Sequence, residues 1–323
     1  MKTTEHGIFV ISLDFELLWG VFDKVDWREK KEYFKTTRNL IPDILQLFEK
    51  YKIQCTWATV GMLFNANWDE WNQNIPEALP EYDNRKLSAY EYGKSIQSME
   101  TEEFCFAPQL IRQLKETPGQ EIGTHTYSHY YCLEAGQNIK NFRADLSRAI
   151  DLANKMECRI HSLVFPRNQF NNQYLIICKE LGIENIRINP DNWYWRDTQK
   201  DSLVHKIYRT ADAYYGKQDK AYSIDEIKNS EGISHQKASR FLRPYSASAK
   251  FNQLKMKRIL EEMEESAKKG LIYHLWWHPH NFGNRREESL IDLEQILLKY
   301  EELKNIYGYQ SLSMKKLRSD VIE

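Results

Sequence analysis

Two histidines, His125 and His129, stand four residues apart in the stretch His-Thr-Tyr-Ser-His, directly after a short apolar segment. On a turn, side chains four positions apart lie about 5–6 Å from each other and can bind one metal ion. In a continuous strand the same spacing separates them by about 13 Å, so a shared ion requires this stretch to bend. The chain has nine histidines in 323 residues. Because chance alone produces such a pair in roughly one chain in four, it predicts a metal site only if a third ligand is present.

Two carboxylates, Asp14 and Glu16, follow an apolar run near the amino end of the sequence. Side chains two positions apart on a strand point to the same face. One acid can complete a three-ligand metal site, while the other takes the proton of the metal's water. Three protein ligands leave coordination positions open, as a catalytic zinc requires. The residues alone leave open which acid binds the metal.

Four other residues of chemical interest lie near the ends of predicted strands: Arg167, Asp191, Trp193 and His278. Arg167 can hold a carboxylate with two hydrogen bonds, or be a plain surface cation. Asp191 and Trp193 also fit an Asx turn with a core indole. The ring of Pro279 restricts the backbone of His278 to an extended form. His274 and His278 are also four residues apart, but their segment predicts a strand, so we do not expect them to share an ion.

The elements that must position these residues alternate between strands and helices, which indicates an α/β fold with a parallel sheet. We predict strands at residues 7–12, 53–60, 120–123, 161–165, 185–188 and 271–277, and helices at 37–51, 108–117, 141–156, 173–181 and 287–303. Residues 65–104 and 195–250 break this rhythm, and we predict them to be inserted segments of a single domain spanning 1–323. Because chemistry collects at the carboxyl ends of parallel strands, we expect the reactive residues to meet at one edge of the sheet.

Composition excludes several classes of protein. Forty-five basic residues balance 46 acidic ones, which argues against a nucleic-acid partner because a binding face would need a basic excess. The five cysteines form no C-x-x-C pair and are expected to be reduced thiols in the cytoplasm. The apolar run at 8–13 is too short for a secretory signal, and no run is long enough to span a membrane. Serine-hydrolase, phosphate-loop and dinucleotide motifs are absent from the sequence.

Two arginines, Arg240 and Arg243, lie within the second inserted segment. An arginine cluster can bind the phosphate of a nucleotide-linked or lipid-linked substrate. A basic helix end docked on the body of the domain is the simpler explanation. The sequence leaves both interpretations open.

The order of these motifs resembles the polysaccharide deacetylase family, the NodB homology domain of carbohydrate esterase family 4. The resemblance runs over about residues 8–283 and rests mainly on the acid pair and on His-Thr-x-Ser-His. It implies a distorted (β/α) barrel of about seven parallel strands. It also implies a hydrolase that uses one divalent metal ion, zinc, to remove the acetyl group of an N-acetylated sugar. The spacing of the two acids and the ending His-Pro-His-Asn-Phe look like the branch linked to bacterial surface-polysaccharide loci.

The resemblance also implies a role for each matching residue. Asp14 would be the general base, and Glu16, His125 and His129 would be the metal ligands. Arg167 would orient the base, Asp191 would support the site, and His278 would protonate the departing amine. The residues expected to contact the sugar are Trp19, Trp193, Trp277 and His280.

The sequence departs from the family pattern at two motifs. The family more often has adjacent aspartates in the first motif, whereas here one residue separates the two acids. The third motif is usually Arg-x-Pro, but here Pro166 precedes Arg167, so Arg187 is an alternative partner for Asp14. Two other functions therefore stay open. One is hydrolysis of another C–N amide bond, and the other is carbohydrate binding without turnover.

Overall fold

The computed structural model describes residues 4–196, 202–216 and 220–322. Its strands are β1 (Ile8–Phe15), β2 (Cys55–Thr59), β3 (Gln120–Thr124), β4 (Ser162–Val164), β5 (Asn185–Ile188), β6 (Lys228–Ser230), β7 (Ile233–Lys237), β8 (Arg240–Phe241), β9 (Ile272–Trp277) and β10 (Gln310–Leu312). Its α-helices are α1 (Lys31–Lys50), α2 (Trp68–Gln73), α3 (Ala89–Ile96), α4 (Met99–Cys105), α5 (Pro108–Glu116), α6 (Ile139–Lys155), α7 (Leu175–Glu180), α8 (Trp193–Arg196), α9 (Leu203–Ala211), α10 (Ala249–Lys269), α11 (Arg286–Tyr307) and α12 (Met314–Leu317).

The strands form one sheet in the order β6-β7-β5-β4-β3-β2-β1-β9-β8, with β10 also paired to β1. Among the pairings between these strands only β6–β7 is antiparallel, and an isolated antiparallel bridge joins Tyr222 to Ile272. One continuous segment, residues 233–242, joins the two ends of this order. Ala238 N–H donates to the Ile188 carbonyl at 2.9 Å, and Ser239 N–H donates to the His274 carbonyl at 2.8 Å. The sheet therefore curls into a distorted barrel. Its wall consists of β1 to β5, the continuous segment β7–β8, and β9.

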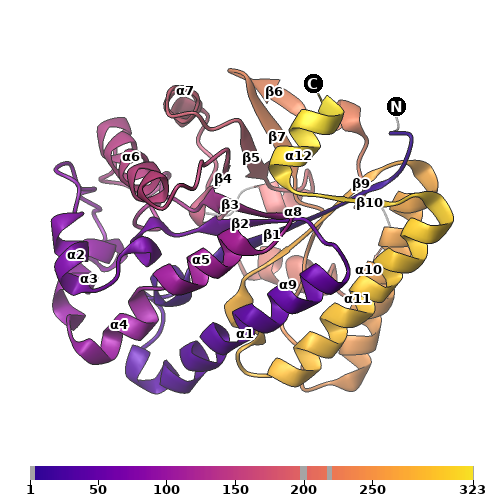
Figure 1. Cartoon of the computed structure of the whole chain (residues 1–323), viewed down its shortest axis with the longest axis horizontal. Coiled ribbons are helices and arrows are strands. Elements are labelled where there is room, and N and C mark those ends of the chain that lie inside the picture. The colour runs from indigo at the N-terminus through magenta and orange to yellow at the C-terminus, as the bar shows by residue number, and fades with distance from the viewer. Residues whose placement is uncertain (1–3, 197–201, 217–219, 323) are drawn as a thin grey trace.

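Helices cover the outside of this barrel. In Figure 1 the helices α5, α1, α11 and α10 lie side by side, and each contacts the next. The odd-numbered residues of β1 (Phe9, Ile11, Leu13 and Phe15) join the main hydrophobic core beneath the helices. Strand side chains alternate between faces, so the even-numbered residues face the barrel interior. The expected α/β barrel is confirmed.

The barrel interior is apolar at one end and polar at the other. At the amino ends of the strands, Ile8 and Val10 form a small cluster with Ile272 and Leu312. Further along β1 the interior positions are Ser12 and Asp14, both fully buried. Hydrogen bonds stabilise a polar interior, and the guanidinium of Arg187 donates to both Ser12 and Asp14.

The interrupting segments contain more regular structure than their sequences suggest. Residues 65–104, in which the sequence shows no clear helical period, contain the three short helices α2, α3 and α4. Residues 195–250 are not an addition outside the barrel, because β7 and β8 close it. The sequence analysis also missed α10, whose dense Lys and Glu residues obscure its apolar face. Residues 197–201 and 217–219 of the predicted inserted segment lie outside the described residues.

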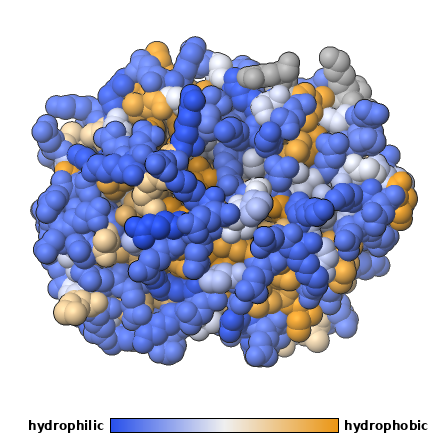
Figure 2. All heavy atoms as spheres, viewed as in Figure 1, coloured by the Kyte–Doolittle hydropathy of each residue, from blue (hydrophilic) through white to orange (hydrophobic). Residues whose placement is uncertain are grey.

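The visible surface is mostly hydrophilic, with scattered hydrophobic side chains (Figure 2). In the described part of the chain, no helix combines the length and the apolar character needed to cross a membrane.

Candidate active site

The two acids stand where β1 ends and the chain turns away. Asp14 lies in the strand, whereas Glu16 precedes a short 3-10 helix that ends at Gly20. A Cβ atom at Gly20 would lie 1.6 Å from the Glu16 carboxylate oxygen Oε2. Only glycine leaves room for this carboxylate, so Gly20 is a site residue that the sequence analysis missed. A glycine four residues after the acid was its only signal.

The two histidines sit on a bent loop after β3. Thr126 and His129 adopt left-handed backbone conformations, with φ of 63° and 57°. The loop folds back on itself, and the ring centroids of His125 and His129 lie 5.0 Å apart. The expected bend is confirmed.

Asp145, a buried residue on α6, holds this loop in place. Its carboxylate accepts hydrogen bonds from the backbone N–H of Tyr127 at 2.7 Å and of Ser128 at 3.2 Å. The hydroxyls of Ser128 and Tyr90 donate to it as well. These bonds fix Tyr127 and Ser128, two of the three residues between the histidines. The sequence analysis missed Asp145 because nothing in the helical pattern of α6 distinguishes it.

The ring nitrogens of both histidines that face away from Glu16 are already engaged. Nδ1 of His125 bonds the Val164 carbonyl at 2.8 Å, and Nδ1 of His129 lies 3.1 Å from the Tyr131 hydroxyl. The Nε2 atoms remain for another partner. Such outer contacts are the usual way of orienting histidine ligands.

Glu16, His125 and His129 together fit a metal ion. Their ligand atoms lie within 4.8 Å of one another, and all three residues are buried. Glu16 Oε2 lies 3.1 Å from His129 Nε2, yet this buried oxygen makes no hydrogen bond. Buried carboxylate oxygens normally have a partner, and a cation between the two atoms would supply one.

Asp14 is bound by Arg187, not by Arg167. The Arg187 guanidinium donates to Oδ1 and Oδ2 of Asp14 at 2.8 and 2.7 Å and lies 4.2 Å from the ring centroid of Trp276. Arg167 instead pairs with Asp23 and stacks on the Tyr131 ring at 4.1 Å. The expected position of Arg167 on Asp14 is therefore corrected. Arg187 lies inside the barrel because β5 presents alternate residues to the interior.

His278 lies on the other side of the acids, just after β9. Its Nε2 atom is 3.0 Å from Glu16 Oε1 and 3.6 Å from Asp14 Oδ2. Asn281 Nδ2 lies 3.4 Å from Nδ1 of the same ring. The other ring nitrogen, Nε2, is therefore the one that faces the acids.

Opposing charges control the protonation of these groups. Burial raises the pKa of the Asp14 carboxyl, but the charges of Arg187, His125 and His278 outweigh it, so the net pKa falls below its usual value. The pKa of Glu16 falls well below its usual value in spite of burial, because of His278 and His129. Burial lowers the pKa of His278, but the two carboxylates outweigh burial and raise it. The site therefore contains two anions beside one imidazole that favours its cationic form.

Residues 18–186 match the family model of the polysaccharide deacetylases, which is more than half of the chain. The chain belongs to the polysaccharide deacetylase family. The matched span contains His125 and His129. Glu16 and His278 lie outside it, and the fold brings them to the histidine pair. Members of this family are in general metal-dependent hydrolases of acetylated sugars.

Solved structures with this fold share little sequence with the chain. A Mycobacterium smegmatis protein assigned to the polysaccharide deacetylases has a TM-score of 0.62 at 13% identity, over 98% of this chain and 90% of that one. A Pseudomonas aeruginosa PAO1 protein with the same assignment has a TM-score of 0.57 at 10% identity, over 98% and 93%. Puue allantoinase has a TM-score of 0.55 at 12% identity, over 99% and 93%. At such identities the likeness shows the fold alone. No curated protein matches the chain.

The remaining residues that the family resemblance indicated lie in different surroundings. Asp191 pairs with Lys237, and its side chain is 68% exposed. Trp193 is half exposed and packs against His205 and Tyr208. Both side chains therefore lie at the surface, whereas Asp14 and Glu16 are buried.

Two expected sugar contacts, Trp19 and Trp277, are fully buried in the hydrophobic core, so their rings are not available to a substrate. Trp19 stacks on Trp71, and Trp277 stacks on Phe282. Trp277 points outward because β9 directs the preceding residue, Trp276, into the barrel. The expectation that Trp19 and Trp277 contact the sugar is therefore corrected.

Arg240 and Arg243 follow the simpler of their two interpretations. Arg240 is buried and holds Glu262 with two hydrogen bonds of 2.6 and 2.7 Å. Arg243 donates to the Arg209 carbonyl at 2.8 Å. Both arginines dock their segment on the barrel.

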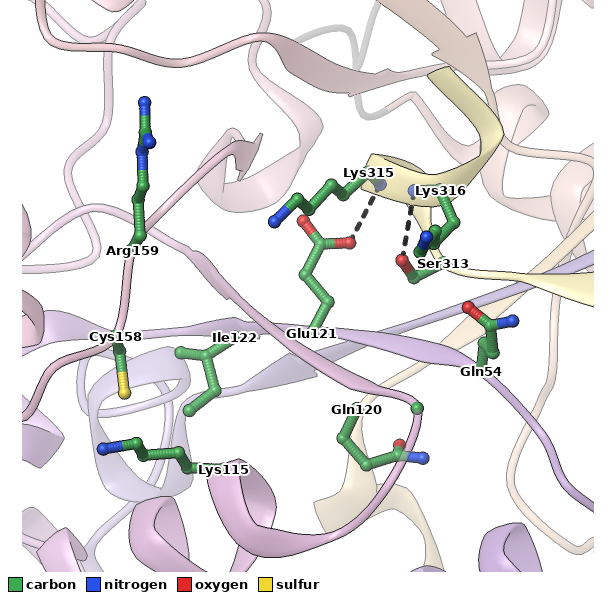
Figure 3. Close-up of a pocket in the computed structure, with 11 residues that line it drawn as sticks. Gln54, Lys115, Gln120, Glu121, Ile122, Cys158, Arg159, Ser313, Lys315 and Lys316 are labelled. Carbon is green, nitrogen blue, oxygen red and sulfur yellow. Dashed lines mark hydrogen bonds between the residues drawn. The ribbon is translucent and has the colours of Figure 1, made fainter. Parts of the chain in front are cut away.

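A pocket of about 280 Å³ lies away from this site, beside the amino ends of β2 and β3 (Figure 3). Figure 3 shows the Glu121 carboxylate between Lys315 and Ser313, and it accepts a hydrogen bond from the Lys315 backbone at 3.0 Å. The candidate active site of this polysaccharide deacetylase family member lies instead at the carboxyl ends of the same strands.

Proposed function

We propose that this protein is a metal-dependent hydrolase that removes the acetyl group from an N-acetylated sugar during bacterial surface-polysaccharide biosynthesis. The observation that carries the proposal is the arrangement around Glu16. His129 faces one oxygen of its carboxylate and His278 faces the other, and His125 offers a ligand atom within 4.8 Å of those of Glu16 and His129. Asp14, fixed by Arg187, lies beside them. A three-ligand metal group thus stands next to a separate base and a separate acid.

The chemistry follows from the positions of these groups. A divalent ion held by Glu16, His125 and His129 would polarise the amide carbonyl and lower the pKa of a water molecule. Imidazole and carboxylate ligands suit zinc. Asp14, kept anionic by Arg187, accepts the proton of the attacking water. Its Oδ2 atom lies 3.6 Å from His278 Nε2, so the base and the acid can act on the same substrate amide.

His278 completes the reaction at the leaving group. Its raised pKa favours the protonated ring, and Nε2 faces the acids rather than solvent. From there Nε2 donates its proton to the sugar nitrogen as the C–N bond breaks. This step releases the amine in its neutral form and leaves His278 neutral.

We propose a cytoplasmic substrate, such as a nucleotide-linked or lipid-linked acetamido sugar. The five cysteines are free and buried, which supports a reducing compartment. The chain's nearly balanced charge supports a sugar rather than a nucleic acid as partner.

Acetate release tests the proposal. The zinc-loaded protein is incubated with N-acetylated oligosaccharides and, in parallel, with other amides. We expect acetate only from the sugars, and we expect Asp14→Asn and His278→Ala to lower its rate by at least about 100-fold. Asp151→Asn, an exposed acid on α6, is the control and should leave the rate unchanged. Full activity in both site variants would refute the assigned roles.

A further inference from the structure

The two oxygens of the Glu16 carboxylate face different histidines. Oε2 lies 3.1 Å from His129, beside His125, and Oε1 lies 3.0 Å from His278. The ring of His280 stacks on that of His278, with centroids 4.9 Å apart and planes inclined by 14°. The ligand atoms of Glu16, His278 and His280 lie within 4.8 Å of one another. A carboxylate has lone pairs on both oxygens and can ligate one ion with each.

His280 has the properties of an unused ligand. It is only 7% exposed, and among the described residues no hydrogen bond engages its ring nitrogens. A ring nitrogen without a hydrogen-bond partner has a lone pair that can bind a metal ion.

An ion from solvent can reach this group. The side chain of His278 is 24% exposed, whereas those of Glu16 and His129 are each 3% exposed. The ring of His280 packs against the rings of Tyr33 and His278. Two imidazoles and one carboxylate form a donor set that suits zinc and similar borderline metals.

We propose that Glu16, His278 and His280 form a second divalent-cation site, and that an ion bound there inhibits the enzyme. This inference rests on the proposed function of the neighbouring metal group. The second ion takes the lone pair of His278 Nε2, the atom that would otherwise deliver the proton to the leaving nitrogen. Repulsion from the first ion and from Arg187 makes this second ion the weaker one.

Metal stoichiometry tests the second site without depending on activity. The metal-free full-length protein is titrated with zinc against a chelating dye. We expect two ions per chain, one tight and one weaker. His280→Asn and His278→Asn should each lose the weaker ion and keep the tight one. His161→Asn, a histidine paired with Glu184 away from the site, is the control and should still bind two.

The outcomes separate this proposal from the proposed function. One ion per wild-type chain, lost in His125→Asn, overturns the second site and leaves the proposed function standing. If the wild-type chain binds no ion, the proposed function itself is overturned. Two ions per chain in both His278→Asn and His280→Asn place the second ion elsewhere and overturn the proposal.

Inhibition supplies a second readout. Acetate release by the wild type should fall at least tenfold as zinc rises from one equivalent to saturation of the weaker site. In His280→Asn the zinc concentration needed for half-inhibition should rise by at least about tenfold. The same concentration in both proteins would contradict an inhibitory role for this group.

Discussion

At the scale of single residues, the metal group depends on atoms that would not touch the metal. The Tyr131 hydroxyl lies 3.1 Å from Nδ1 of His129 and so sets the direction of Nε2. We expect Tyr131→Phe to weaken zinc binding by about 10–100-fold, the usual cost of losing such a contact. Zinc affinity measured against a chelator checks this. Tyr51→Phe, which loses a hydroxyl bond to Glu294 outside the site, should bind zinc as the wild type does.

The general base Asp14 also depends on a neighbouring residue, and either Arg187 or Arg167 could orient it. Lysine keeps the charge of arginine but cannot make both hydrogen bonds to a carboxylate. We therefore expect Arg187→Lys to lower the rate of acetate release by about 100-fold through the misplaced Asp14. Arg167→Lys, which alters only the contacts with Asp23 and Tyr131, should cost less than about tenfold. Steady-state kinetics of the two variants show which arginine orients Asp14. A larger loss in Arg167→Lys than in Arg187→Lys would assign that role to Arg167.

At the scale of elements, helix α6 holds the histidine loop through one side chain. Asp145→Asn replaces an acceptor of several hydrogen bonds, each worth about 2 kcal/mol when the acceptor is charged. We expect the free energy of unfolding of the metal-free protein to fall by at least about 2 kcal/mol. Zinc affinity should fall with it, because the loop bears both histidines. Urea unfolding and zinc titration measure the two effects.

The control for this prediction lies on the same helix. Asp151 is exposed, so Asp151→Asn should change stability by less than about 0.5 kcal/mol. Equal effects of the two substitutions would show that the contacts of Asp145 do not hold the loop.

Sequence patterns predicted the bounds of strands better than they predicted which side chains face the barrel interior. The strand at residues 185–188 was predicted with its exact bounds, because alternating polar and apolar residues mark it. That same alternation places Arg187 beside Asn185 on the interior face, and the alternation of β9 places Trp276 there with His274. If the alternation of side chains between the two faces had been applied to each strand, it would have placed Arg187 rather than Arg167, and Trp276 rather than Trp277, inside the barrel.

Other features had no local signal in the sequence. The closure of the barrel by residues 233–242 depends on pairings with β5 and β9, which are distant in sequence. Gly20 and Asp145 matter only because of what the fold brings against them. Such long-range contacts cannot be read from residue types or spacing.

At the scale of the whole molecule, the polar barrel interior makes stability depend on pH. His274 is fully buried beside Ser12, and burial lowers its pKa to about 3, with a contribution from Arg187. In the unfolded chain it would titrate near pH 6.5. Between about pH 3 and 6.5 the unfolded state therefore binds the extra proton, so stability falls as the pH falls through this range. His278, with its raised pKa, acts in the opposite direction: its contribution is full below about pH 6.5 and is lost at higher pH.

A comparison with one variant isolates the effect of His274. Urea unfolding of the metal-free protein between pH 6 and pH 5 should show a loss of roughly 1 kcal/mol per pH unit from this histidine. His274→Gln cannot bind the proton, so its slope should be shallower by that amount, while the contribution of His278 cancels in the difference. Asp14 and Glu16, whose pKa values are lowered, lose their contributions only below about pH 4 and leave this window unaffected. Equal slopes in both proteins would mean that His274 exchanges its proton in the folded state, and that the barrel interior is open to water.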